Sequence, residues 1–229
     1  MQYRISGDVF PMVEFRLERG ESVYTESGGM AWMSDQIKMS TSTRGGLMAG
    51  LGRALAGESL FMVSYTCEGD NGTVVFTPEA EAPGQILEMQ LQPNQSLICQ
   101  KDTFLCAQES VQIKMHFRKH LGAGLFGGEG FILQEITGPG MAFLAIPGGV
   151  YERTLESGET LLIDPGHIAM FEPSVQYDIN MVKGVKNVLF AGEGLFLATL
   201  KGPGKIWLET MPISNLAAKI SKYIARKSG

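Results

Sequence analysis

Hydrophobic and polar residues alternate with a period of two along several short stretches of the chain. The alternation is clear in residues 22–25 and 111–117. Successive side chains of a β-strand point to opposite faces, so this pattern predicts strands with one buried face and one solvated face. Residues 60–63, 131–133 and 195–197 are almost continuously apolar and predict strands that are covered on both faces.

The predicted strands belong to a unit that occurs three times along the chain. A segment of the form L-x-x-G-E-x-hydrophobic begins at Leu17, recurs in a looser form at Leu91 and recurs again at Leu155. The second and third copies align without a gap. Repetition at this period is typical of one supersecondary unit built several times, in which each copy needs its neighbours to bury its apolar face.

These patterns predict an all-β fold, a three-repeat antiparallel β-sandwich or β-prism that resembles a double-stranded β-helix, with a short C-terminal helix. Each repeat is expected to hold about four short strands joined by tight turns. Residues 1–212 are predicted to form a single β domain with repeats at about 15–84, 85–148 and 149–212. Residues 213–229 are predicted to form an amphipathic basic helix.

Composition agrees with this fold class. Of 229 residues, 29 are glycine, which suits a protein with many tight turns. No apolar run approaches the roughly 18 residues that a membrane-spanning helix needs, and the first residues lack the pattern of a signal peptide. We therefore expect a cytoplasmic protein. Its cysteines, which are odd in number and lack a framework spacing, are predicted to be reduced and buried. They are Cys67, Cys99 and Cys106.

Charge is distributed unevenly between the body and the C-terminal segment. Residues 213–229 contain four basic residues and no acidic residue, whereas residues 1–212 contain the other 15 basic residues and all 24 acidic residues. The acidic body disfavours a nucleic-acid partner, because phosphate binding needs a basic face. The basic helix fits a membrane surface or a protein partner; the alternative is a cap over an open sheet edge, with its basic side chains solvated. Its candidate contact residues are Lys219, Lys222, Arg226 and Lys227.

Two glycine-rich loops carry a second set of candidate contact residues. Their apolar side chains either form an exposed interaction surface or become buried where subunits meet. Exposed sheet edges and these loops together favour a homo-oligomer. The loop residues are Leu47, Met48, Leu51, Leu125 and Phe126.

One acidic residue follows a glycine at the same place in every repeat. A ring of three carboxylates is one way to bind a cation through oxygen. The favoured interpretation is structural, because a carboxylate after a glycine at the start of a strand usually accepts backbone N–H groups and fixes a turn. The three residues are Glu58, Glu129 and Glu193.

The histidines give a weak indication of a metal site. His167 follows Asp164-Pro165-Gly166, which resembles half of the second cupin motif, but the companion H-x-H segment is absent from the chain. A metal-dependent cupin-like enzyme is therefore the alternative function, with His167 as its candidate ligand. The H-x3-H pair, His116 and His120, lies in a strand-like stretch, where the two rings are too far apart to bind one ion. We predict no cofactor and no catalytic residue.

Several longer segments resemble one known family over nearly the whole chain. They include GGMAWM at residues 28–33, LAGESLF at 55–61, GGEGF at 127–131, GETLLID at 158–164 and GPGKIW at 202–207. These segments resemble the bacterial and archaeal branch of the altered-inheritance-of-mitochondria family. The resemblance implies a fold similar to that of the tryptophan RNA-binding attenuation protein, and it brings no catalytic motif. Fungal members support the organisation of the mitochondrial inner membrane.

The residues and the resemblance together favour a non-catalytic scaffold or binding protein. We expect it to form homo-oligomers and to associate with a membrane surface or a protein partner. The tryptophan and RNA sites of the attenuation protein have no residue-by-residue counterpart here, so its activity does not follow from the fold.

Overall fold

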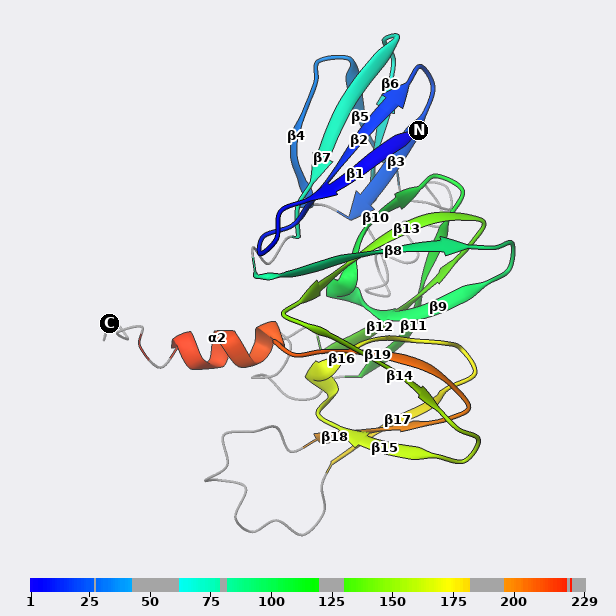
Figure 1. Ribbon diagram of the computed structural model, residues 1–229, viewed down its shortest axis with the longest axis vertical. Coiled ribbons are helices and arrows are strands. Elements are labelled where there is room, and N and C mark those ends of the chain that lie inside the picture. Colours follow the sequence, from blue (N-terminus) through cyan, green and yellow to red (C-terminus); the bar gives the residue numbers. More distant parts are fainter. Residues whose placement is uncertain are drawn as a thin grey trace. The chain divides into compact units, whose positions relative to one another are not determined.

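The computed structural model describes residues 1–26, 28–42, 62–78, 82–119, 130–181, 196–221 and 223 (Figure 1). Across these residues the chain forms nineteen β-strands, two 3-10 turns and one α-helix. Every strand pairing whose register is resolved is antiparallel, as for β2 with β7 and β14 with β19. The predicted all-β fold with a short C-terminal helix is confirmed.

Six strands fall in each of three successive stretches, which we call repeats 1, 2 and 3. Repeat 1 contains β2 (Met12–Glu18), β3 (Ser22–Glu26), β4 (Met30–Met33), β5 (Ile37–Ser42), β6 (Met62–Cys67) and β7 (Asn71–Phe76), and β1 (Gln2–Ser6) precedes it. Repeat 2 contains β8 (Gly84–Leu91), β9 (Ser96–Gln100), β10 (Phe104–Gln108), β11 (Gln112–Lys119), β12 (Phe131–Thr137) and β13 (Gly140–Pro147), with the 3-10 turn η1 (Lys101–Thr103).

Repeat 3 has the same order. It contains β14 (Val150–Leu155), β15 (Thr160–Ile163), β16 (Ile168–Phe171), β17 (Gln176–Met181), β18 (Phe196–Lys201) and β19 (Gly204–Glu209), with the 3-10 turn η3 (Pro165–His167). The helix α2 (Ile213–Ser221) follows β19. Six strands a repeat exceed the expected four, because strands such as β10 and β16 are buried at nearly every position and so lack a period-two pattern.

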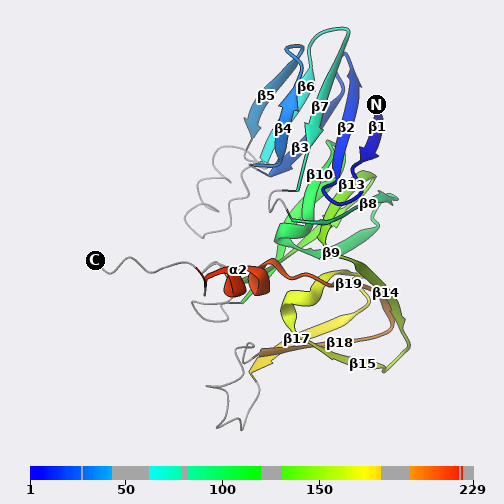
Figure 2. The same ribbon diagram turned by 60° about the vertical axis from the view of Figure 1, so that its left-hand side comes forward.

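The strands form four sheets, and each repeat contributes three strands to each of two of them. In order, the sheets are β1-β2-β7-β4, β5-β6-β3-β10-β13-β8, β11-β12-β9-β16-β19-β14 and β15-β18-β17. We call them sheets 1 to 4. The chain divides into two compact units: sheets 1 and 2 belong to the first, and most of sheet 3 and all of sheet 4 belong to the second. Figure 2 shows the strands of each sheet from a second direction.

Each six-stranded sheet joins half of one repeat to half of the next through a single strand pair. In sheet 2 the pair is β3 with β10, and in sheet 3 it is β9 with β16. Both junctions are antiparallel, and they bring equivalent positions of the repeats opposite one another. The opposed residues are Tyr24 and Ala107, Val23 and Gln108, Cys99 and Met170, and Ile98 and Phe171.

The third strand of every repeat contains an irregularity at the same place. The register shifts between Met30 and Trp32 in β4, and equivalent shifts occur in β10 and β16. An extra residue of this kind bends a strand and increases its twist. The third strand is therefore bent at the same place in all three repeats.

Each unit has its own hydrophobic core. In the first unit, Phe15 packs edge-on against Phe76 and Phe143, with ring centroids 5.8 and 5.0 Å apart. In the second unit, the buried residues include Phe131 and Phe171. Burial of such aromatic and aliphatic side chains is the main stabilising contribution in domains of this size.

The three apolar runs do not have the same surroundings. The strands β6 and β12 are buried at most positions, as a continuous apolar run predicts. In contrast, β18 alternates between buried and more exposed positions, and Leu197 is exposed. The prediction of a strand covered on both faces is therefore wrong for β18, which lies in the three-stranded sheet 4.

Candidate functional site

The first repeated polar feature is a turn that precedes the second strand of every repeat. The side-chain oxygen of its fourth residue accepts a hydrogen bond from the backbone N–H of its first residue. Such a bond satisfies a donor that a tight turn leaves without a partner in the sheet. The pairs are Glu18 with Glu21 at 2.9 Å, Gln92 with Gln95 at 2.9 Å, and Glu156 with Glu159 at 2.8 Å. We call this feature turn A.

The third residue of turn A has a positive φ in all three repeats. The residues are Gly20 at 83°, Asn94 at 64° and Gly158 at 80°. Glycine adopts this left-handed conformation without steric cost, and asparagine tolerates it better than most residues. The glycine of the L-x-x-G-E segment is therefore explained by the backbone.

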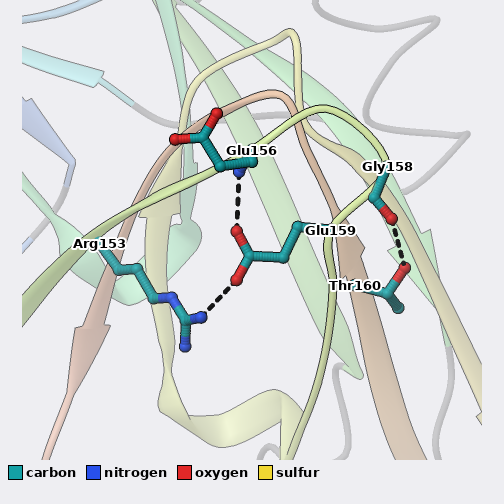
Figure 3. A network of polar contacts seen from close by, with 5 residues as sticks. All are labelled: Arg153, Glu156, Gly158, Glu159 and Thr160. Carbon is teal, nitrogen blue, oxygen red and sulfur yellow. Dashed lines mark hydrogen bonds and ion pairs between the residues drawn. The ribbon is translucent and has the colours of Figure 1, made fainter.

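In repeat 3, turn A also contains an ion pair (Figure 3). The carboxylate of Glu159 accepts a hydrogen bond from the guanidinium of Arg153 on β14. The backbone N–H of Glu156 and this guanidinium lower the pKa of Glu159 below its ordinary value of 4.5. In repeat 1, the N-terminal ammonium of Met1 and the backbone N–H of Glu18 lower the pKa of Glu21 in the same way.

A second repeated turn, which we call turn B, follows the third strand of each repeat. Its first residue uses a side-chain oxygen to accept a backbone N–H from the last strand of the same repeat. The pairs are Ser34 with Thr73 at 3.0 Å, Gln108 with Met141 at 2.7 Å, and Glu172 with Lys205 at 2.8 Å. The acceptor is a serine, a glutamine or a glutamate, so the repeats have an acceptor oxygen in common but not a charge.

The polar side chains of turns A and B thus bind backbone groups. This is the role that the sequence assigns to Glu58, Glu129 and Glu193, which lie outside the described residues. The acceptors of turn A could have been found from the sequence, because Glu21 and Glu159 stand in the L-x-x-G-E pattern. Turn B gave no such signal, because its three acceptors are of different residue types.

His167 lies in η3, where its Nδ1 is 2.7 Å from the backbone oxygen of Glu209. The turn that presents it is fixed by Asp164, whose side chain accepts the N–H of Gly166 at 3.0 Å. Among the described residues, no three His, Cys, Asp or Glu side chains gather where they could hold a metal ion. The half-cupin segment therefore has the geometry of a capped turn.

The other two histidines do not extend this site. His116 is on β11, and its Nδ1 lies 3.4 Å from the carboxylate of Glu135. The ring of His116 also lies 6.0 Å from that of Tyr177, whose pKa is raised to about 12 by burial. His120 lies outside the described residues.

The candidate interaction residues are described only in part. Lys219 is exposed on α2. Beside it, Ile220 is 50% exposed and Tyr223 is 89% exposed. The remaining candidates lie outside the described residues: Leu47, Met48, Leu51, Leu125, Phe126, Lys222, Arg226 and Lys227.

Cys67, Cys99 and Cys106 form no disulfide, and all three are buried, as predicted. Burial raises the pKa of the Cys106 thiol well above its ordinary value of 9.0. A thiol of this kind is neutral and behaves as a small apolar side chain.

The described part of the chain contains no helix with the length and apolar character needed to span a membrane. Antiparallel sheets, with turns A and B in every repeat, define an all-β protein built from repeated units. The chain belongs to the family described as mitochondrial biogenesis AIM24, whose sequence profile matches residues 3–211.

Two bacterial relatives support this assignment. An uncharacterized protein of Streptococcus pyogenes serotype M6 is 31% identical over 227 residues, which cover 96% of this chain and 89% of the relative. The X-ray crystal structure of a protein from Streptococcus pyogenes is similar to this fold with a TM-score of 0.78. It has 27% identity and covers 97% of this chain and 99% of the other. Both agree with the bacterial branch to which the sequence segments point.

Proposed function

We propose that this protein is a non-catalytic scaffold that self-associates and uses its C-terminal helix to bind an anionic membrane surface. The observation that carries the proposal is the composition of the exposed face of α2. Ile220 on α2 and Tyr223, two residues beyond its end, are exposed and follow the exposed Lys219 closely in the sequence. Apolar and aromatic side chains next to basic ones are characteristic of helices that lie in a membrane interface.

The charge of the tail adds to this argument. Three further basic residues, Lys222, Arg226 and Lys227, follow in the sequence without an intervening acid. Each basic residue near an anionic surface contributes about 1 kcal/mol of attraction. Binding to such a surface is therefore expected to weaken steeply with salt.

A helix that only caps a sheet edge would be expected to bury its apolar stripe. Ile213 and Leu216 are partly buried, but Ile220, one turn further along the stripe, is half exposed. This difference favours a contact function for the C-terminal half of α2.

The non-catalytic part of the proposal is supported by turns A and B. The polar side chains that recur in register accept backbone N–H groups, and His167 is close to a backbone oxygen. The metal-dependent cupin-like enzyme has no comparable support among the described residues.

Flotation with vesicles tests the proposal. The protein is mixed with vesicles of phosphatidylcholine containing about 30% phosphatidylserine, a composition chosen to give a negative surface potential. We expect the unmodified chain to float with the vesicles and a chain ending at Pro212 to remain at the bottom of the gradient. A matched variant, Ile220→Asp with Tyr223→Asp, should also lose binding while keeping its basic residues.

The control uses vesicles of phosphatidylcholine alone, to which binding should be weak. Equal flotation of the full chain and the truncated chain would contradict a membrane role for the helix. If the full chain binds no vesicle but captures a cellular protein through residues 213–229, the contact is with a protein and the membrane proposal is wrong.

A further inference from the structure

The strand order leaves two strands without the neighbour that their counterparts have. In repeats 1 and 2, the second strand pairs with the third strand of the following repeat, as β3 does with β10 and β9 with β16. The second strand of repeat 3, β15, ends sheet 4, where β18 is its neighbour. The third strand of repeat 1, β4, ends sheet 1, where β7 is its neighbour. Among the described strands, β15 and β4 each have one partner.

The missing neighbour changes the exposure of equivalent apolar residues. Tyr24, Ile98 and Leu162 each lie three residues after the acceptor of turn A. Tyr24 and Ile98 are buried at the junctions, whereas Leu162 is 63% exposed. Sheet 4 thus presents to solvent an apolar side chain at a position that the other repeats bury.

At the other edge, formed by β4, equivalent residues of the third strand also differ in exposure. Trp32, Cys106 and Met170 each lie two residues before the acceptor of turn B. Cys106 and Met170 are fully buried, whereas Trp32 is 52% exposed. A large exposed aromatic residue is typical of the centre of a protein interface.

Charges and prolines, which usually prevent strand addition, are absent from both edges. The irregularity in β4 does not exclude pairing, because β10 and β16 contain the same irregularity and pair at the two junctions. Natural edge strands are protected by lysine, proline or inward-pointing charges. The sequences of the two strands are Met-Ala-Trp-Met in β4 and Thr-Leu-Leu-Ile in β15, without a charge or a proline. Both edges therefore have the composition of internal strands.

We propose that β15 of one copy of the chain pairs antiparallel with β4 of a second copy and forms a third junction of the same kind. The register follows from the two junctions within the chain. Since Ile98 lies opposite Phe171 and Cys99 lies opposite Met170, the equivalent pairs between copies are Leu162 opposite Met33 and Ile163 opposite Trp32.

The partner at these edges is thus a second copy of this chain, bound head to tail. Because the two surfaces are different, a copy that has joined through one edge keeps the other edge free. Such contacts produce either a closed ring of copies or an open filament whose length grows with protein concentration. This inference rests on the proposed scaffold function and supplies the contact for its self-association.

Mixing two variants with one blocked edge each provides the test. Trp32→Lys places a charge on β4 and leaves β15 intact, while Leu162→Lys does the reverse. Both side chains are more than half exposed, so the folded chain tolerates the change. Light scattering should give a mass above the 24.9 kDa of one chain for the unmodified protein. Each variant alone should give the mass of a single chain, and an equimolar mixture should give twice that mass.

Matched controls are Met39→Lys on β5 and Tyr151→Lys on β14. These residues are also exposed and apolar. Their strands are edge strands, but so are the counterparts of β5 and β14 in repeat 2, β11 and β8, so neither strand lacks a neighbour that its counterpart has. Both controls should assemble like the unmodified chain. Thermal unfolding of every variant checks that the fold is retained.

Three results would overturn the proposal. One is an unmodified chain that stays a single chain at all concentrations up to the millimolar range. Another is assembly of either blocked variant alone, because a symmetric contact of β4 with β4 or of β15 with β15 survives when the other edge is blocked. The third is a mixture that contains only single chains although both variants are folded.

Cysteine cross-linking tests the register with milder substitutions. A double variant, Met33→Cys with Leu162→Cys, should form a ladder of covalent multimers when oxidised glutathione is added. Met33→Cys with Ile163→Cys should not, because a shift of one residue places the two side chains on opposite faces. Equal ladders, or no ladder from the first variant, would contradict the proposed pairing.

The two proposals fail separately. Vesicle flotation depends on α2 and not on Trp32 or Leu162, whereas the mixing experiment uses no lipid. Loss of vesicle binding with intact assembly would reject the membrane role alone, and the reverse result would reject the head-to-tail contact alone.

Discussion

Glu159 accepts the backbone N–H of Glu156 at 2.8 Å, and Gln95 accepts that of Gln92 at 2.9 Å in the equivalent turn. The chain therefore contains a charged and a neutral version of turn A. Because the two acceptors occupy the same position, the contribution of the charge can be separated from that of the hydrogen bond.

The first prediction concerns stability at low pH. The pKa of Glu159 is lowered in the folded protein by the N–H of Glu156 and by Arg153, so the folded state binds a proton less readily than the unfolded chain. The contribution of ionised Glu159 to stability is thus present above its ordinary value of 4.5 and is lost as the pH falls below it.

Glu159→Gln should keep the turn and remove this titration. Urea unfolding between about pH 6 and pH 3 should give a shallower loss of unfolding free energy than in the unmodified protein. Gln95→Glu is the matched variant and should make the loss steeper. If the unfolding free energy depends on pH in the same way in all three proteins, these carboxylates do not couple folding to pH.

The second prediction concerns the left-handed residue of turn A. A Cβ atom at Gly158 would meet no heavy atom within 4 Å, so a substitution there acts through the backbone conformation alone. Gly158→Ala should lower the unfolding free energy by about 1 kcal/mol. Gly158→Asn should cost less, because Asn94 adopts the same conformation with φ of 64°. Chemical denaturation compares the two variants, and an Asn variant less stable than the Ala variant would contradict this explanation.

The third prediction concerns a close backbone approach. A Cβ atom at Gly202 would lie 2.4 Å from the backbone oxygen of Glu156, and one at Gly138 would lie 2.4 Å from that of Gln92. Since a backbone oxygen cannot move away without distorting the turn, Gly202→Ala should cost up to about 3 kcal/mol. Gly138→Ala should lower the unfolding free energy by a similar amount. A loss at Gly202 no larger than that at Gly158 would show that the turn relaxes easily.

The fourth prediction concerns the thiols. Cys67, Cys99 and Cys106 are buried, and burial raises the pKa of Cys106. The folded protein should therefore react slowly with Ellman's reagent at pH 8, and denaturant should release three reactive thiols for each chain. Cys99→Ala should release two under the same conditions. Rapid reaction of the folded chain would show that one of these thiols reaches solvent.

Much of the local structure could be predicted from the order of residues. The alternation in residues 22–25 falls in β3, and the apolar run 131–133 falls in β12. The predicted solvated face is wrong for β3, because Val23, Tyr24 and Thr25 are all buried. Turn A can be recognised in the sequence because its glycine and its acceptor residue occupy fixed positions before a strand. The sequence also indicated a helix from Ile213, and α2 begins there.

Other features had no local signal. The number of strands was underestimated, because β10 and β16 are buried on both faces and show no alternation. His167 was singled out by its Pro-Gly turn, yet the backbone oxygen beside it comes from Glu209, 42 residues later in the chain. The acceptors of turn B were missed because three residue types provide the same oxygen.

The sequence by itself determined the repeat, the turns and the apolar strands, because these depend on backbone conformations and side chains a few residues apart. It did not determine which apolar residues are buried. Trp32 and Leu162 stand in segments that resemble those containing the buried Cys106 and Ile98, but their exposure depends on which strand lies beside them. That neighbour is set by pairing between distant parts of the chain, which only the tertiary structure decides.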